Sequence, residues 1–147
     1  MRIDKAFAVP ARGGYFNDDL VAIRAGARRD GFTYEGSPQT PGFGMIRQPS
    51  EAASLVLLLD NGQAVAGDAL SVQYSGAGGR QGPFRHEQQL PHLAHVCRWL
   101  EGQPIGAFLE MCERLEKQPF PDGLNRTAAA YAVSQALLQA VARAALG

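Results

Sequence analysis

The 147-residue sequence has no long hydrophobic run and no excess of charge, and each absence excludes a class of protein. The longest uninterrupted aliphatic run, Leu55 to Leu59, is far shorter than the roughly 20 residues that a membrane-spanning helix needs. The first residues contain no apolar core of a signal peptide, so we expect a cytoplasmic protein without membrane contact. Fourteen basic residues balance fourteen acidic ones, which argues against nucleic acid as a partner.

The sequence is also poor in cysteine and lacks the common signatures of catalysis. Its two cysteines, Cys97 and Cys112, are typical of reduced core thiols rather than of a disulfide framework. No serine stands in a G-x-S-x-G context, and neither cysteine has an obvious activating partner. By itself, therefore, the chain lacks the groups of a complete catalytic apparatus.

Histidine is scarce, and the three that are present fall in one predicted helix. His92 and His95 are i,i+3 neighbours on such a helix, and a shared metal ion is one interpretation of the pair. A zinc site needs three or four ligands, however, and neither His86 nor any other nearby side chain supplies the rest. We interpret all three as helix-surface histidines and predict no metal ligand in this chain.

Hydrophobic periodicity predicts strands in the first half of the chain and helices in the second. The alternation over residues 2–9 favours a strand that ends at Pro10. Asn17 is then a good N-cap for a helix over residues 18–28, with Asp18 and Asp19 in its first turn. For residues 31–49, which are rich in glycine and proline, we expect one short strand.

The clearest local signal is a β-hairpin at Asp60-Asn61-Gly62, because Asn-Gly tolerates the positive φ angles of tight hairpin turns. Its strands are predicted over residues 53–59 and 63–74. On the second strand Leu70, Val72 and Tyr74 would share the apolar face, so that Gln73 points away from it.

Helical spacings follow over residues 84–101, 104–117 and 124–146. In the last of these helices the predicted apolar stripe consists of Ala130, Val133, Leu137, Val141 and Ala144 or Ala145. Strands followed by helices predict one α+β domain, an antiparallel β-meander followed by a helical layer.

The most informative segment is the glycine-rich stretch at the end of the second hairpin strand. Glycine there indicates unusual backbone angles or the close approach of another group. The spacing fits neither a P-loop nor a dinucleotide-binding motif, which leaves a plain surface turn or a loop that borders a small-molecule site. The polar side chains and glycines of interest are Gln73, Tyr74, Ser75, Gly76, Gly78, Gly79 and Arg80.

Several segments resemble methylaspartate ammonia-lyase, a family of the enolase superfamily. The most specific is Val72-Gln73-Tyr74-Ser75-Gly76-Ala77-Gly78-Gly79-Arg80, preceded by Gly67-Asp68. Others lie around Asp18-Asp19, Asp30 to Ser37, Gly42-Phe43, Arg47-Gln48, and Asn125-Arg126 through Ala142. The resemblance covers essentially the whole chain, residues 1–147. It implies an enolase-like N-terminal capping domain. The family's catalytic (β/α)-barrel is absent from this chain, so we expect the chain to be a fragment or a separate subunit.

The resemblance also implies the chemistry: reversible elimination of ammonia from 3-methylaspartate to give mesaconate, a step of amino-acid catabolism in glutamate degradation. The implied partners are the family's own C-terminal barrel, an amino-acid substrate and a second copy in a homodimer. Mg²⁺ is the implied cofactor, with ligands that are not on this chain, and the chain alone would be inactive. Gln73 matches the family's cap residue beside the substrate amino group, while Tyr74 to Arg80 would shape and close the pocket.

Two alternatives remain open at this point. One is the cap of another enolase-superfamily enzyme, such as a cycloisomerase, racemase or dehydratase. The other is a stand-alone binding or dimerisation module descended from such a cap. The apolar end of the last helix, Ala144-Ala145-Leu146, instead indicates an interface with a further domain.

Overall fold

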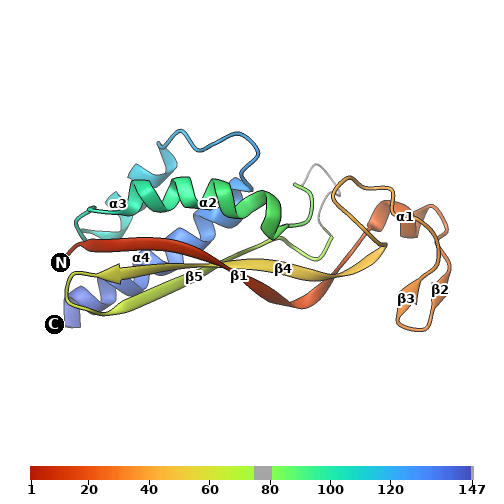
Figure 1. Cartoon of the computed structure of the whole chain (residues 1–147), viewed down its shortest axis with the longest axis horizontal. Helices are drawn as coiled ribbons and strands as arrows, with labels where there is room; N and C mark the ends of the chain where they lie inside the picture. The colour runs from red at the N-terminus through yellow and green to blue at the C-terminus, as the bar shows by residue number, and fades with distance from the viewer. Residues whose placement is uncertain (75–80, 147) are drawn as a thin grey trace.

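A computed structural model describes residues 1–74 and 81–146 and shows an antiparallel sheet covered on one face by helices (Figure 1). The predicted α+β class is confirmed. The sheet order is β1-β4-β5, with β1 (Ile3–Asp18), β4 (Arg47–Leu59) and β5 (Ala64–Leu70). The helical layer contains α2 (His86–Leu100), α3 (Phe108–Glu116) and α4 (Arg126–Leu146). At the opposite end lies a small lobe of α1 (Leu20–Arg24), β2 (Arg29–Asp30) and β3 (Thr33–Tyr34) (Figure 1).

The first strand is longer than the sequence predicts, because it does not end at Pro10. That residue lies within β1, opposite Ala53 of β4. β1 pairs only with β4 and is therefore an edge strand, where proline is tolerated because one side of the strand has no neighbour to receive a hydrogen bond. The register shifts between Arg12 and Phe16, after which β1 continues into the small lobe.

The predicted hairpin turn is confirmed at Asn61-Gly62. Gly62 has a φ of +83°, which explains the need for glycine, and its N–H donates to the Leu59 carbonyl at 2.9 Å. The first strand of the hairpin begins six residues earlier than predicted, at Arg47. The second ends earlier, at Leu70.

The predicted inner face of the second hairpin strand is wrong. Val65, Gly67 and Ala69 are buried, whereas Val72 and Tyr74 lie beyond β5 and are 55% and 41% exposed. The cause is the close approach of α4 to β5: a Cβ atom on Gly67 would lie 2.0 Å from the backbone oxygen of Ala132. A side chain larger than that of glycine therefore has no room at Gly67, which lies on the buried face.

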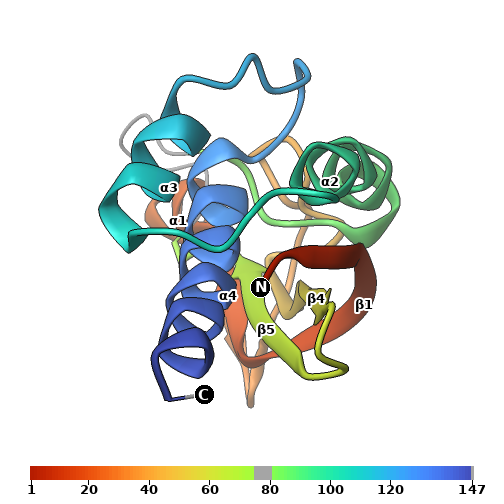
Figure 2. The same cartoon turned by 90° about the vertical axis from the view of Figure 1, so that its left-hand side faces the viewer.

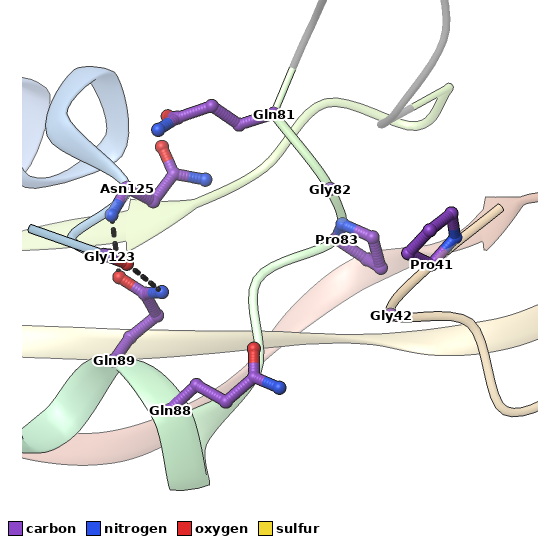
Figure 3. A pocket seen from close by; sticks show the side chains of 9 residues that line it. All are labelled: Pro41, Gly42, Gln81, Gly82, Pro83, Gln88, Gln89, Gly123 and Asn125. Carbon is purple, nitrogen blue, oxygen red and sulfur yellow. Dashed lines mark hydrogen bonds between the residues drawn. The ribbon is translucent and has the colours of Figure 1, made fainter.

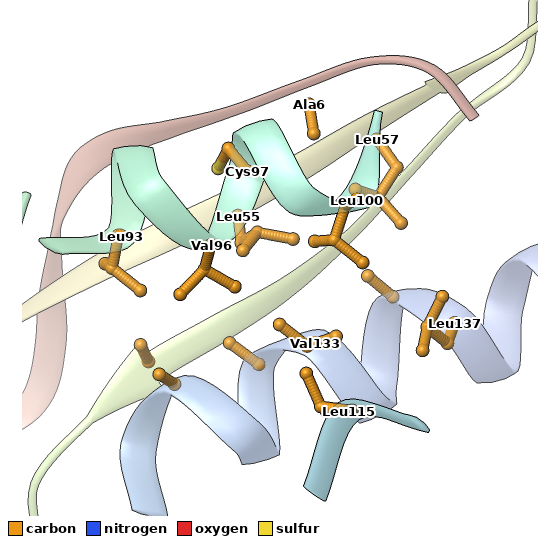
Figure 4. Close-up of a cluster of buried hydrophobic side chains, with 14 of the residues drawn as sticks. Ala6, Leu55, Leu57, Leu93, Val96, Cys97, Leu100, Leu115, Val133 and Leu137 are labelled. Carbon is orange, nitrogen blue, oxygen red and sulfur yellow. The ribbon is translucent and has the colours of Figure 1, made fainter. Parts of the chain in front are cut away.

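The three predicted helices are confirmed, with ends shifted by a few residues, and they form one core with the sheet (Figure 4). α2 packs on β1 and α4 packs on β5, both on the same side of the sheet (Figure 2). Val133 and Leu137 of the predicted α4 stripe are fully buried, but Ala144 and Ala145 are exposed. The labelled core residues of Figure 4 are Ala6, Leu55, Leu57, Leu93, Val96, Cys97, Leu100, Leu115, Val133 and Leu137.

Both cysteines are free thiols, as expected. Cys97 is buried in the core, and this burial raises its pKa to about 11, so it is protonated at neutral pH. Cys112 is half-buried and its pKa is raised by the same cause. Burial thus disfavours the thiolate, the reactive form of cysteine, in both residues. Within the described residues, no helix combines the length and the apolar character that crossing a bilayer requires.

Candidate functional site

The segment that follows β5 carries Gln73 and lies against the end of β1. The Gln73 carbonyl accepts a hydrogen bond from the Asp18 N–H at 3.0 Å. Two residues earlier, the Ser71 hydroxyl accepts one from the Phe84 N–H at 3.0 Å. Gln73 and Tyr74 are both exposed. The remaining residues predicted for the pocket loop lie outside the described part of the chain: Ser75, Gly76, Gly78, Gly79 and Arg80.

The acidic pair before the small lobe has a different role from the predicted one. Asn17 is not the N-cap and the two aspartates are not in the first helical turn: Asp18 ends β1, and Asp19 caps α1, which covers only residues 20–24. The tertiary partner of Asp18 is Arg47, directly opposite it in the β1–β4 register. No local signal links positions 18 and 47, so sequence reasoning missed this pair.

The Asp18–Arg47 ion pair is bidentate and largely shielded from water. Arg47 Nε donates to Asp18 Oδ1 at 2.7 Å and Nη2 donates to Oδ2 at 2.8 Å. The Arg47 side chain is 14% exposed and the Asp18 side chain is 5% exposed. The hydrogen bond to Asp18 raises the pKa of the Arg47 guanidinium, despite the opposing effect of partial burial, so Arg47 is always charged.

Arg47 also connects this pair to the small lobe. Its Nη1 donates to the Phe32 carbonyl at 2.9 Å. Its guanidinium carbon lies 5.0 Å from the centre of the Phe32 ring and 5.1 Å from that of the Tyr34 ring. The Phe32 ring in turn meets Phe16 of β1 edge to face, with ring centres 4.9 Å apart. The lobe is thus fixed to the strand end that holds Gln73.

Asp19 anchors the loop that follows the lobe. Its carboxylate accepts hydrogen bonds from the Gln39 N–H at 2.5 Å, the Thr40 N–H at 2.9 Å and the Thr40 hydroxyl at 2.6 Å. It also caps α1 through the Ala22 N–H at 3.4 Å. Burial alone would raise the pKa of Asp19, but these hydrogen bonds outweigh burial and lower it.

Asp19→Asn is expected to lower the free energy of unfolding by about 1–3 kcal/mol at pH 7, because charge-assisted hydrogen bonds to a buried carboxylate are lost. A folded-state pKa below the ordinary value of 3.8 adds stability above that pH, and the addition disappears as the pH falls. Urea unfolding at pH 7 and pH 3 should therefore show a smaller difference from the unsubstituted protein at pH 3. The matched control is Asp30→Asn, because Asp30 is an exposed residue of β2 in the same lobe. An equal loss at both pH values would contradict this account.

A separate hollow of about 390 Å³ lies between the loop that follows the lobe, at Pro41 and Gly42, and the segment before α4, at Gly123 and Asn125 (Figure 3). Gln89 lines the hollow. Its side-chain amide donates a hydrogen bond to the Gly123 carbonyl at 3.0 Å and accepts one from the Asn125 N–H at 2.7 Å. Gln73 does not line this hollow. The described residues that line it are amides, prolines and glycines, none of them titratable: Pro41, Gly42, Gln81, Gly82, Pro83, Gln88, Gln89, Gly123 and Asn125.

The three histidines all lie in α2, as predicted, but they have separate neighbours. His86 lies 3.7 Å from Glu51 and 2.5 Å from the Ala11 carbonyl. His95 Nδ1 faces Arg98 at 3.3 Å. Among residues 1–74 and 81–146 there is no group of three or more histidine, cysteine or acidic side chains that would hold a metal ion. Asp18 and Asp19 are occupied by Arg47 and by N–H and O–H donors, so this part of the chain does not fit a magnesium site.

Comparison with known proteins identifies the family that this chain resembles. Residues 1–146 match the sequence model described as methylaspartate ammonia-lyase N-terminus. The chain is 43% identical over 145 residues to methylaspartate ammonia-lyase of Citrobacter amalonaticus, covering 98% of this chain and 35% of that protein. It spans about a third of the length of the curated relatives that it matches.

Solved structures give the same result. The Mg complex of β-methylaspartase from Clostridium tetanomorphum is 39% identical with a TM-score of 0.93, over 99% of this chain and 35% of that one. The Citrobacter amalonaticus enzyme containing (2S,3S)-3-methylaspartic acid is 44% identical with a TM-score of 0.91, over 98% and 35% of the two chains. The Q73A variant of the Clostridium tetanomorphum enzyme is 38% identical with a TM-score of 0.92, over 99% and 35%. The chain therefore belongs to the methylaspartate ammonia-lyase N-terminus family.

Proposed function

We propose that this chain is the capping portion of a methylaspartate ammonia-lyase and that Gln73 contacts the amino group of the substrate. The single observation that carries the proposal is the family match over residues 1–146. The chain spans about a third of the length of the matched enzymes. This match favours the capping domain of this family over that of another enolase-superfamily enzyme.

The proposed reaction is the reversible elimination of ammonia from 3-methylaspartate to give mesaconate, with the reacting groups in a C-terminal barrel. This division of roles is supported by the share of the matched enzymes that the chain spans, which is about a third of their length. Magnesium would accordingly be held outside this part of the chain. The cap would exclude water from the pocket and orient the substrate.

The exposed amide of Gln73 suits a contact with an amine. Its carbonyl oxygen accepts a hydrogen bond from an ammonium group, and its NH₂ donates to a carboxylate, without adding charge to the pocket. We propose that Tyr74 and the segment Ser75 to Arg80, including Gly76, Gly78 and Gly79, shape and close the pocket around it. A cytoplasmic homodimer remains part of the same proposal.

The test uses the full-length enzyme, meaning this chain in one polypeptide with the remaining two thirds of a methylaspartate ammonia-lyase. Gln73→Ala should change the preference between ammonia and methylamine, in their addition to mesaconate, by about 1–3 kcal/mol, the size expected for a hydrogen bond to a charged group. The measurement is the ratio of kcat/KM for the two amines.

Gln88→Ala is the matched control, because Gln88 is another exposed glutamine and lines the hollow of Figure 3 instead. We expect its amine preference to be unchanged. If Gln88→Ala alters the preference and Gln73→Ala does not, the substrate lies in the hollow and the proposed contact is wrong.

A further inference from the structure

The position of Gln73 depends on a part of the fold that is remote in sequence. β5 ends at Leu70, so Gln73 is not held by the strand ladder. The Gln73 carbonyl instead accepts a hydrogen bond from the N–H of Asp18, which lies 55 residues earlier in the sequence. Whatever fixes Asp18 therefore also fixes the backbone from which the Gln73 amide projects.

Asp18 is fixed by a charged, two-point contact. Two parallel hydrogen bonds of 2.7 and 2.8 Å join its carboxylate to the Arg47 guanidinium. Bidentate pairs of this kind restrict both distance and orientation, which a single hydrogen bond does not. The Asp18 side chain is only 5% exposed, so water competes little for it.

Arg47 is in turn fixed by the hairpin of β2 and β3. The guanidinium lies over the rings of Phe32 and Tyr34 and donates a hydrogen bond to the Phe32 carbonyl. These contacts leave it little freedom. We call Asp18, Arg47, Phe32 and Tyr34 the arginine clamp. It lies at the end of the molecule where the small lobe meets β1 and β4 (Figure 1).

We propose that Asp18 and Arg47 are positioning residues that hold the Gln73 amide in the direction required for amine selection, an inference that rests on the function proposed for Gln73. The clamp acts through the Asp18 N–H and the Gln73 carbonyl and touches no reacting atom. Small displacements of a substrate contact have large kinetic costs, so loosening the clamp should alter selectivity without removing any group that binds substrate.

Arg47→Lys is the variant of choice, because it keeps the charge that compensates Asp18 but loses the planar fork and the stacking. In the full-length enzyme we expect it to shift the ammonia-to-methylamine ratio of kcat/KM in the same direction as Gln73→Ala, by about fivefold, a size typical of residues coupled in one network. Arg28→Lys is the matched control: Arg28 belongs to the same lobe, but its ion pair with Glu35 is 3.6 Å long and exposed.

The decisive measurement is a double-mutant cycle. If Arg47 acts through Gln73, Arg47→Lys has no further effect on the ratio in the Gln73→Ala background. Independent effects that multiply in the double variant would overturn the inference. So would a shift with Gln73→Ala and none with Arg47→Lys.

Hydrogen exchange of the Asp18 amide in the 147-residue chain separates this inference from the proposed function. Arg47→Lys should accelerate that exchange several-fold, because the bond to the Gln73 carbonyl is then less well held. Unchanged exchange would overturn the positioning role. Faster exchange with no change of amine preference in either Arg47→Lys or Gln73→Ala would overturn the function proposed for Gln73 instead.

Discussion

Gly67→Val is expected to lower the free energy of unfolding by about 3 kcal/mol or more, which is a large share of the roughly 5–15 kcal/mol of a typical domain. The reason is steric. A Cβ atom at Gly67 would lie 2.0 Å from the backbone oxygen of Ala132, 2.9 Å from its carbonyl carbon and 3.0 Å from Cβ of Gln135. The first two are backbone atoms of α4, so a change of side-chain rotamer does not relieve the clash. The helix itself must move away from β5.

The measurement is urea unfolding followed by circular dichroism, with Gly14→Val as the matched control. Gly14 lies in β1, is exposed, and has no atom within 4 Å of the position that a Cβ would occupy. We expect the control to change the free energy of unfolding by no more than about 0.5 kcal/mol. Equal stabilities of Gly67→Val and Gly14→Val would show that α4 does not pack against β5 as described.

The same contact explains what sequence reasoning achieved and missed in the sheet. The Asn61-Gly62 turn is a local signal, since the backbone angle that it requires is set within two residues, and it is confirmed. The inner face of β5 depends instead on how closely α4 approaches at Gly67. Hydrophobicity favours the face of Leu70 and Val72, whereas packing selects the smaller residues Gly67 and Ala69.

The missed continuation of β1 has a similar cause. Proline ends a strand only where its missing N–H would have faced a paired neighbour, and the sequence does not reveal that β1 is an edge strand. The helices were predictable because their apolar spacing is local, although the stripe of α4 shifted toward Ala132 and Ala136, where small side chains allow the close approach.

The candidate site was only partly predictable. The glycine-rich segment draws attention to Gln73, but the role of its amide follows only from the resemblance to the family and stays a prediction. The arginine clamp could not be predicted from the sequence. Asp18 and Arg47 meet only because β1 pairs with β4, and 28 residues separate the two positions. Asp18-Asp19 followed by a basic segment is typical of a helix start, and this local pattern hid the ion pair.

The largest expected effect on activity comes from combining the chain with a barrel. We propose that this chain contributes the neutral amide of Gln73, whereas its described residues contain no group of three or more side chains that would hold a metal ion. Joined in one polypeptide to the C-terminal two thirds of the Citrobacter amalonaticus enzyme, it should complete a pocket that releases ammonia from (2S,3S)-3-methylaspartic acid, the compound present in that enzyme's structure.

Ammonia release from that compound, measured for the joined polypeptide and for the 147-residue chain alone, tests the assignment most directly. We predict release by the joined polypeptide, a change of its amine preference when Gln73 is replaced by alanine, and no release by the chain alone. A joined polypeptide that folds, as judged by circular dichroism and thermal unfolding, yet releases no ammonia would contradict the assignment, and so would release by the chain alone.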